Sequence, residues 1–170
     1  MLSEKVQQAL NDQINAELFS FYIYLAMAAY FEDQDFPGFA RWMRAQAQEE
    51  MGHAMRMYDY IVERKGRVAL AALDQPQLAW DSPLAAFQAA LAHEQTITGR
   101  INALVDLARA ENDFATDSFL QWFVDEQVEE EASVDAVVQD LRRVADFPPG
   151  LFLMDRELGQ RQPGAEGSEA

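Results

Sequence analysis

The sequence predicts an all-α protein: a four-helix bundle with one long crossover and a short fifth helix at the C-terminus. Apolar residues recur at helical spacing over four long stretches, and no stretch alternates apolar and polar residues as a strand does. The eight Gly and six Pro fall mainly at a few junctions between these stretches. With 170 residues and 19.3 kDa, the chain is long enough for one domain with a sizeable core.

The first helix is expected to begin after Ser3, a suitable N-cap, and to end at the turn 33–38. Its apolar residues are Val6, Leu10, Ile14, Phe21, Leu25 and Ala28. The second helix is expected over 37–65, with Pro37 in its first turn and Gly66 as its C-cap. Its apolar residues are Phe39, Met43, Ala47, Ala54, Met57 and Ile61.

Residues 67–82 show no period and are enough to run the length of a bundle when extended, so they are predicted to form the crossover. The third helix is expected to start at Ser82-Pro83, an N-cap followed by proline, and to end at the turn 111–113. The fourth must end before Pro148. Their apolar residues are Phe87, Leu91, Ile97, Ile101 and Leu104 in the third and Phe119, Phe123, Val134, Val137 and Leu141 in the fourth.

Residues 151–158 are predicted to form a short amphipathic helix. Its apolar residues are Leu151, Met154 and Leu158. We expect this stripe to pack against neighbouring subunits, and the alternative is that the helix folds back on its own bundle. Residues 159–170 are small and polar and are predicted to be a disordered tail, which leaves 1–158 as the folded domain.

Charge and composition exclude several classes of function. Thirteen Lys and Arg against 29 Asp and Glu give a net charge of −16, which repels nucleic acids and favours cations as partners. The absence of cysteine excludes disulfides, Cys-ligated zinc, iron–sulfur clusters and thiol catalysis. No apolar run approaches the ~20 residues needed to span a membrane, and the N-terminus lacks a signal-peptide pattern. A cytoplasmic protein without a membrane partner is expected.

Each long helix has a polar residue where its apolar stripe requires a core residue. These residues are Glu17 in the first helix, Glu50 and His53 in the second, Glu94 in the third, and Gln127 and Glu130 in the fourth. A buried, unpaired carboxylate is very unfavourable, so acids on all four helices need a common partner.

The spacing of these residues reveals an internal two-fold repeat. Glu17 and Glu50 are 33 residues apart, as are Glu94 and Gln127. A shift of 77 residues relates three pairs: Glu17 and Glu94, Glu50 and Gln127, and His53 and Glu130. Two packed hairpins would bring four carboxylates, one imidazole and one amide together at mid-bundle. That set suits two divalent cations with Glu50 available to bridge them, and a metal-free helical scaffold is the alternative.

Several segments resemble the bacterial non-haem ferritins over residues 1 to about 158. They are Glu17 with Tyr24, the run QEEMGH at 48–53, HEQ at 93–95, FLQWF at 119–123 and EQVEEE at 126–131. The resemblance implies a ferritin-like bundle that assembles into a hollow homo-oligomer of 24 subunits. It also implies that Fe(II) is oxidised by O2 or H2O2 at a di-iron ferroxidase centre within each subunit, and that Fe(III) mineral is stored inside.

The resemblance also implies the metal ligands. The first iron would be held by Glu17, Glu50 and His53, and the second by Glu50, Glu94 and Glu130, with Gln127 alongside. A third iron site would comprise Glu49, Glu126, Glu129 and Glu130, for which a solvated acidic face is the alternative. Tyr24 resembles a tyrosine that can supply an electron during oxygen reduction, and a plain core tyrosine is its alternative. His93 is interpreted as non-ligating and Trp122 as a packing residue.

Three related families fit less well. Rubrerythrins carry a Cys-ligated iron domain, which this sequence cannot form. Bacterioferritins have Glu-x-x-His in both halves, whereas the second half here reads Gln127-x-x-Glu130. Met51 is placed much as their haem-binding Met is, but a Met on a helix usually packs in a core or an interface, so haem is not expected. The DNA-protecting mini-ferritins place their site between subunits and usually lack a fifth helix.

Overall fold

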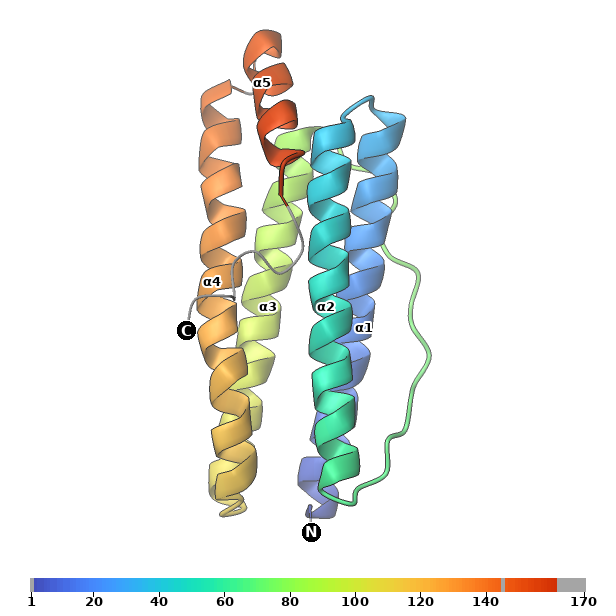
Figure 1. Cartoon of the computed structure of the whole chain (residues 1–170), viewed down its shortest axis with the longest axis vertical. Coiled ribbons are helices and arrows are strands. Elements are labelled where there is room, and N and C mark those ends of the chain that lie inside the picture. Colours follow the sequence, from blue (N-terminus) through green and yellow to red (C-terminus); the bar gives the residue numbers. More distant parts are fainter. Residues whose placement is uncertain (1, 145, 162–170) are drawn as a thin grey trace.

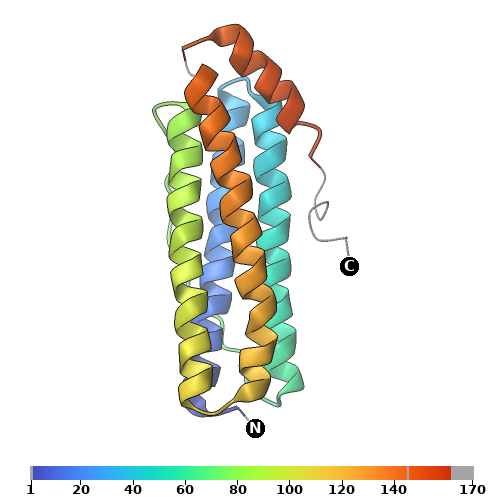
Figure 2. The ribbon, with the colours of Figure 1, turned by 90° about the vertical axis from the view of Figure 1, so that its left-hand side faces the viewer.

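The computed structural model describes residues 2–144 and 146–161, and in these residues the chain forms five α-helices and no strand. The helices are α1 (Glu4–Asp33), α2 (Pro37–Glu63), α3 (Pro83–Ala110), α4 (Phe114–Val144) and α5 (Pro148–Leu158). Helices α1 to α4 run side by side, and α5 lies at an angle over one end of them (Figures 1 and 2). The predicted four-helix bundle with a short fifth helix is confirmed.

The helix ends follow most of the predicted signals. The side chain of Ser3 accepts a hydrogen bond from the Val6 amide (3.3 Å), and α2 begins at Pro37 as expected. At the end of α2 the prediction was wrong, because the helix stops at Glu63 and Gly66 is not its C-cap. Lys65 instead takes the left-handed conformation, with a φ of 57°.

Residues 67–82 form the crossover, which runs the length of the bundle beside α1 (Figure 1). Asn11 of α1 holds the start of the crossover. Its side chain donates a hydrogen bond to the Arg67 carbonyl (3.0 Å) and accepts one from the Ala69 amide (2.8 Å). Near its end, Trp80 packs edge-on against Tyr30. The second hairpin is therefore inverted relative to the first, as the crossover length and the two-fold repeat predict.

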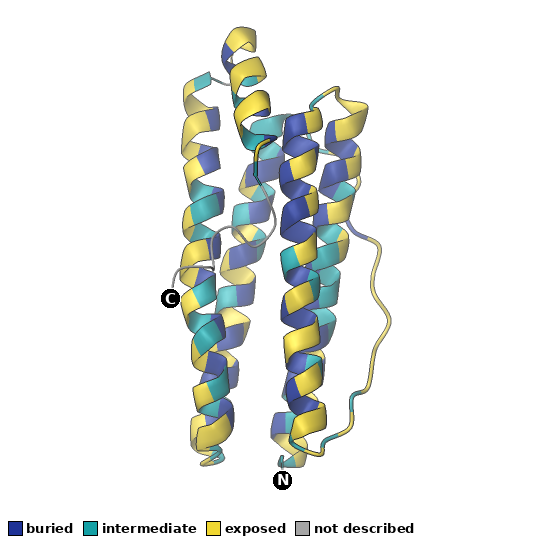
Figure 3. Cartoon of the chain, viewed as in Figure 1, coloured by how far each residue is buried: buried dark blue, intermediate teal, exposed yellow. Residues whose placement is uncertain are grey.

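Buried residues recur along all four long helices (Figure 3). They form two apolar clusters, one toward the α5 end and one toward the opposite end. The first includes Phe31, Phe39, Phe87 and Leu141, and the second includes Leu10, Ile61, Leu120 and Phe123. Between the two clusters lie the polar residues that interrupt the apolar stripes, so the polar residues form a layer at mid-bundle.

The core face of α1 differs from the prediction after Glu17. Leu25 is 38% exposed and Phe21 is half-buried, whereas Tyr24, Met27 and Phe31 are fully buried. The 3.6-residue period starting from Glu17 reaches Tyr24 two turns later and leaves Leu25 beside the core face. In the third helix, Leu91 is likewise half-buried.

Helix α5 packs on its own bundle, so the expectation that its stripe packs on neighbouring subunits was wrong. Leu151, Met154 and Leu158 all contact the apolar cluster at that end, and α5 starts three residues earlier than predicted. The opposite side of α5 exposes Phe152 and Leu153. Gly159–Arg161 continue along α2, where Arg41 donates to the Gly159 carbonyl (2.8 Å). The rest of the predicted tail, 162–170, lies outside the described residues.

Helix α1 contains an 18-residue window with a mean hydropathy of at least 1.2, so by length and composition alone it could cross a membrane. One face of α1 packs into the bundle core and carries the buried Glu17 and Tyr24. Packing in the bundle core accounts for the apolar residues of that buried face, as for any core helix of a bundle.

Candidate metal centre

The polar layer at mid-bundle contains all six residues that interrupt the apolar stripes, and none is more than 5% exposed. They are Glu17 on α1, Glu50 and His53 on α2, Glu94 on α3, and Gln127 and Glu130 on α4. Helical periodicity places them inward because each lies three or four residues from a buried apolar neighbour. The sequence-based expectation that these side chains are buried is confirmed.

On one side of the layer, Glu17, Glu50 and His53 converge. One ligand atom from each lies within 4.8 Å of the other two, and His53 Nδ1 is 3.6 Å from Glu50 Oε2. Gln13 donates a hydrogen bond to Glu17 Oε1 (2.8 Å), whereas Glu17 Oε2 is buried with no hydrogen-bond partner among the described residues. An orphaned carboxylate oxygen beside a second carboxylate and an imidazole fits the donor set of a divalent cation.

On the other side, amide and hydroxyl groups hold Glu94 and Glu130 near Glu50. Gln46 Nε2 donates to Glu50 Oε1 (3.2 Å) and also to Glu130 Oε2. The Tyr24 hydroxyl donates to Glu94 Oε1, and Gln127 Nε2 donates to Glu94 Oε2 (3.3 Å). These contacts form two hydrogen-bonded groups: Gln46 joins α2 to α4, and Glu94 joins α3 to α1 and α4.

Burial shifts the protonation of the carboxyl groups. Burial, together with the neighbouring charge of Glu50, raises the pKa of Glu17 to about 8. Burial also raises the pKa values of Glu50, Glu94 and Glu130, and the charge of Glu94 adds to the rise at Glu50. Near neutral pH the layer therefore holds protons, and a bound cation would displace them.

The acidic residues predicted for a third site do not form a single group. Glu126 joins His53 and Glu130, with one ligand atom from each within 4.8 Å of the others. Glu49 is instead ion-paired with Arg161 (2.7 Å), and Glu129 is exposed. The grouping of Glu126 with His53 was not expected from the sequence.

Two further residues beside the centre were interpreted from the sequence. Trp122 packs edge-on against the His53 ring, with ring centroids 5.5 Å apart, and the Arg56 guanidinium lies 4.0 Å from the Trp122 centroid. His93 hydrogen-bonds to the Ser20 hydroxyl (2.7 Å), and burial lowers its pKa to about 4. Trp122 therefore packs against a candidate ligand, and His93 lies outside both candidate ligand groups.

The sequence interpretation missed the two glutamines that hold the carboxylates. Gln13 and Gln46 are both buried, and each precedes a candidate ligand, Glu17 or Glu50, by four residues. The two glutamines are 33 residues apart, the same spacing as Glu17 and Glu50. This shared spacing could have identified them from the sequence. Arg161 was missed because it belongs to the segment expected to be a disordered tail.

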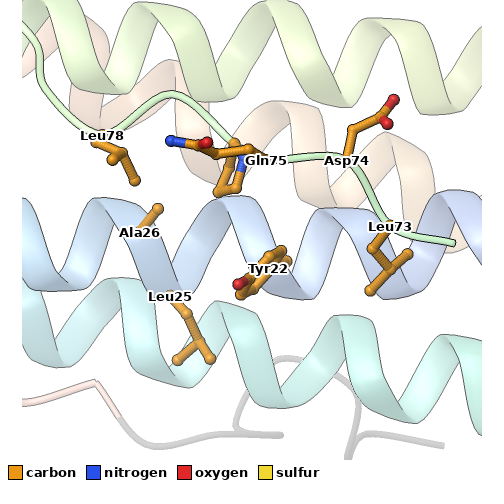
Figure 4. Close-up of a pocket in the computed structure, with 8 residues that line it drawn as sticks. Tyr22, Leu25, Ala26, Leu73, Asp74, Gln75 and Leu78 are labelled. Carbon is orange, nitrogen blue, oxygen red and sulfur yellow. The ribbon is translucent and has the colours of Figure 1, made fainter.

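A separate pocket of about 560 Å³ lies between α1 and the crossover (Figure 4). Most of its lining is apolar, including Tyr22, Leu25, Leu73 and Leu78, and Asp74 is the one carboxylate among its lining residues. It has none of the clustered ligands of the mid-bundle layer. We therefore assign the candidate metal centre to that layer and not to this pocket.

Comparisons with known proteins identify the family of the chain. The ferritin-like domain family matches residues 7–144. The chain is 47% identical to the bacterial non-heme ferritin of Bacteroides fragilis (strain 638R), over 95% of this chain and 100% of the relative. It is 42% identical to that of Staphylococcus aureus (strain MRSA252), over 95% and 97% of the two chains. The solved open pore ferritin of the hyperthermophilic archaeon Archaeoglobus fulgidus superposes with a TM-score of 0.95 at 52% identity, over 95% and 100%.

Proposed function

This chain belongs to the ferritin family, and from that premise we propose that it oxidises Fe(II) at a di-iron ferroxidase centre within each subunit. Membership of the family supports iron storage in a multi-subunit shell. The finer proposal is that O2 or H2O2 is the oxidant and that the Fe(III) mineral is held inside 24 copies of the chain. The observation that carries the proposed ferroxidase centre is the buried convergence of Glu17, Glu50 and His53 beside Glu94 and Glu130.

We assign the substrate ions to two adjacent positions in the polar layer. Glu17, Glu50 and His53 would hold one Fe(II), and Glu50, Glu94 and Glu130 would hold the other, with Gln127 alongside. Support for the shared role of Glu50 comes from its place beside Glu17 and His53 and from its link through Gln46 to Glu130. A shared carboxylate would keep the two ions close enough for one oxidant to reach both.

The chemistry of the donors favours oxidation. Hard, anionic carboxylate oxygens stabilise Fe(III) more than Fe(II), so they make the bound ferrous ion easier to oxidise. Two Fe(II) ions give up one electron each, and one O2 takes both electrons with two protons to become H2O2. Tyr24, hydrogen-bonded to Glu94, lies beside the centre, where it could supply one of these electrons in place of an iron.

Oxidised iron must then leave the layer, and we propose that the acidic flank beside it receives the iron. The Glu126 side chain is 24% exposed, and it lies between the buried candidate ligand His53 and the surface. Glu49, Glu129 and Glu130 complete the proposed third site, although Glu49 is bound to Arg161 in this structure. Third-site binding therefore requires a rearrangement at Glu49.

Assembly into a shell is supported by two exposed apolar surfaces at different places on the molecule. One lies over α1 and the crossover at Tyr22, Leu25 and Leu78, and the other on and beside α5 at Phe152 and Leu153. A closed shell needs more than one kind of subunit contact, whereas a simple dimer needs only one. Two separate apolar surfaces are therefore explained better by a shell than by a dimer. We place the assembled protein in the cytoplasm.

Anaerobic titration of the metal-free protein with Fe(II) tests the proposal. We expect saturation at two to three ions per chain, followed by rapid oxidation when O2 or H2O2 is added. The double variant Glu50→Ala, His53→Ala should keep its helical content but lose rapid oxidation, because it lacks the shared ligand and the imidazole. Binding of one ion or none by the unmodified chain would contradict the di-iron centre and favour a metal-free scaffold.

A further inference from the structure

Arg161 binds the acidic flank of the metal centre from the C-terminal segment. Its guanidinium donates to Glu49 Oε2 (2.7 Å) and to Gln46 Oε1 (2.8 Å), and its Cζ lies 4.3 Å from the Trp42 ring centroid. The Arg161 side chain is only 9% exposed and that of Glu49 is 16% exposed. This is a largely desolvated, charge-assisted contact between residues 112 positions apart, not a loose surface pair.

The same guanidinium is connected to the buried carboxylates through one amide group. Because Gln46 Oε1 accepts from Arg161, its Nε2 faces the opposite way and donates to Glu50 and Glu130. Arg161 therefore contacts a residue proposed for the third iron site and fixes the amide that bridges two proposed di-iron ligands.

We propose that Arg161 is a built-in counter-cation of the metal centre, and that a divalent cation bound at Glu49 displaces it together with the segment 159–161. The inference rests on the proposed function, because it needs a cation to arrive at this flank. The positive guanidinium occupies the Glu49 oxygen that a metal would use, and like charges at one carboxylate repel each other. Docking of the C-terminal segment and occupancy of Glu49 by a metal thus exclude each other.

The structure supports competition at one position of the flank. One ligand atom from each of Glu126, Glu130 and His53 lies within 4.8 Å of the other two, close enough to bind one ion. Glu49 is instead held by Arg161. Release of Arg161 would free Glu49 to turn toward the same ion. If Arg161 were only an anchor for the end of the chain, a cation would bind without moving it.

Calorimetric titration of the assembled, metal-free protein with Zn²⁺, which undergoes no redox change, tests the competition. Arg161→Ala should tighten the weakest class of Zn²⁺ sites about tenfold, because the ion no longer displaces a charge-assisted hydrogen bond. Arg161→Lys should tighten them less, since it keeps the charge but loses the paired donors. Arg156→Ala, an exposed arginine of α5, is the matched control and should leave the affinity unchanged.

Hydrogen exchange of the peptide 155–161 provides a readout that is independent of iron oxidation. In the unmodified protein, Zn²⁺ should speed exchange of this peptide at least several-fold. In Glu49→Gln, exchange should be fast already and should not respond to Zn²⁺. Zn²⁺ binding that leaves exchange unchanged in the unmodified protein, or unchanged affinity in Arg161→Ala, would overturn the inference.

The two failures can be told apart. If only the inference fails, the chain will bind two Fe(II) per subunit as proposed, but Arg161→Ala will not change the affinity for Zn²⁺. A chain that binds neither Zn²⁺ nor Fe(II) would contradict the proposed function, and the inference would fall with it.

Discussion

Gly38 and Asp155, 117 residues apart, meet where α5 crosses the start of α2: the Gly38 amide donates a hydrogen bond to Asp155 Oδ1 at 2.8 Å. The Phe39 amide donates to the same oxygen at 2.9 Å. The N-cap residue of α2, Phe36, makes no side-chain hydrogen bond, so Asp155 takes over the capping role from another helix. A Cβ at position 38 would lie 1.6 Å from the Asp155 carbonyl oxygen, so only glycine permits this approach.

Asp155→Ala should therefore lower the stability of the protein by about 1–2 kcal/mol, the usual effect of losing an N-cap. Gly38→Ala should lower it further, because the added methyl group must push α5 away from α2. Differential scanning calorimetry of each variant against Glu157→Ala, an exposed acid on the same helix, provides the measurement. Equal melting temperatures for Asp155→Ala and Glu157→Ala would show that the cap does not hold α5 in place.

Gln46 is a positioning residue whose removal should weaken metal binding without removing a ligand. Its amide is the bridge between Glu50 and Glu130, so Gln46→Ala leaves both carboxylates free to turn away from the ions. Loss of such an outer contact typically weakens metal affinity about 10–100-fold. Gln48→Ala, at an exposed position two residues on, is the control for anaerobic Fe(II) titration. Equal Fe(II) affinities for Gln46→Ala and Gln48→Ala would show that Gln46 fills space in the core and does not position the ligands.

The carboxyl layer should make the metal-free protein less stable as the pH rises. The pKa of Glu17 is about 8 in the folded chain and near 4.5 in the unfolded chain, so between these values the folded state binds more protons than the unfolded state. Stability then falls with increasing pH across this window, by at most about 1.4 kcal/mol per pH unit for one group. Glu50, Glu94 and Glu130, whose pKa values are also raised, add slopes of the same sign.

Denaturation of the metal-free chain between pH 5.5 and 8.5 measures this slope. Glu17→Gln carries no titrating group at that position and should show a shallower dependence on pH. Saturation with Zn²⁺ should flatten the dependence in the unmodified chain, since the cation replaces the protons. Stability that increases with pH over this range would mean that the layer is charged without a cation.

The repeat made most of the metal layer predictable, because burial follows directly from helical spacing. Glu17, Glu50, Glu94 and Glu130 were found as gaps in apolar stripes, and the structure buries all four. The stripe itself was less reliable: Leu25 was assigned to the core and is 38% exposed. A period of 3.6 residues leaves two adjacent candidates at many turns, and only the neighbouring helices decide between them.

The contacts made by the C-terminus could not be predicted from local sequence. Asp155 and Arg161 are ordinary polar residues in a short helix and a polar tail, and nothing near them in the sequence points to Gly38 or Glu49. Their partners lie more than 100 residues away and become neighbours only when α5 folds back over α2. The packing of α5 was mispredicted for the same reason.

The exposed side of α5 provides the last prediction, which concerns assembly. Phe152 and Leu153 are 61% and 64% exposed, while the other side of α5 is fixed to its own bundle. Phe152→Glu with Leu153→Glu should leave the fold and cation binding intact but break a shell of about 460 kDa, 24 times the 19.3 kDa chain, into smaller species. Truncation after Phe147 should also break the shell, and it should lower the melting temperature because it removes the Asp155 cap. Light scattering at micromolar concentration measures the mass: an unmodified chain that is only monomeric or dimeric would contradict the shell, and a double variant that still assembles would place the subunit contacts elsewhere than α5.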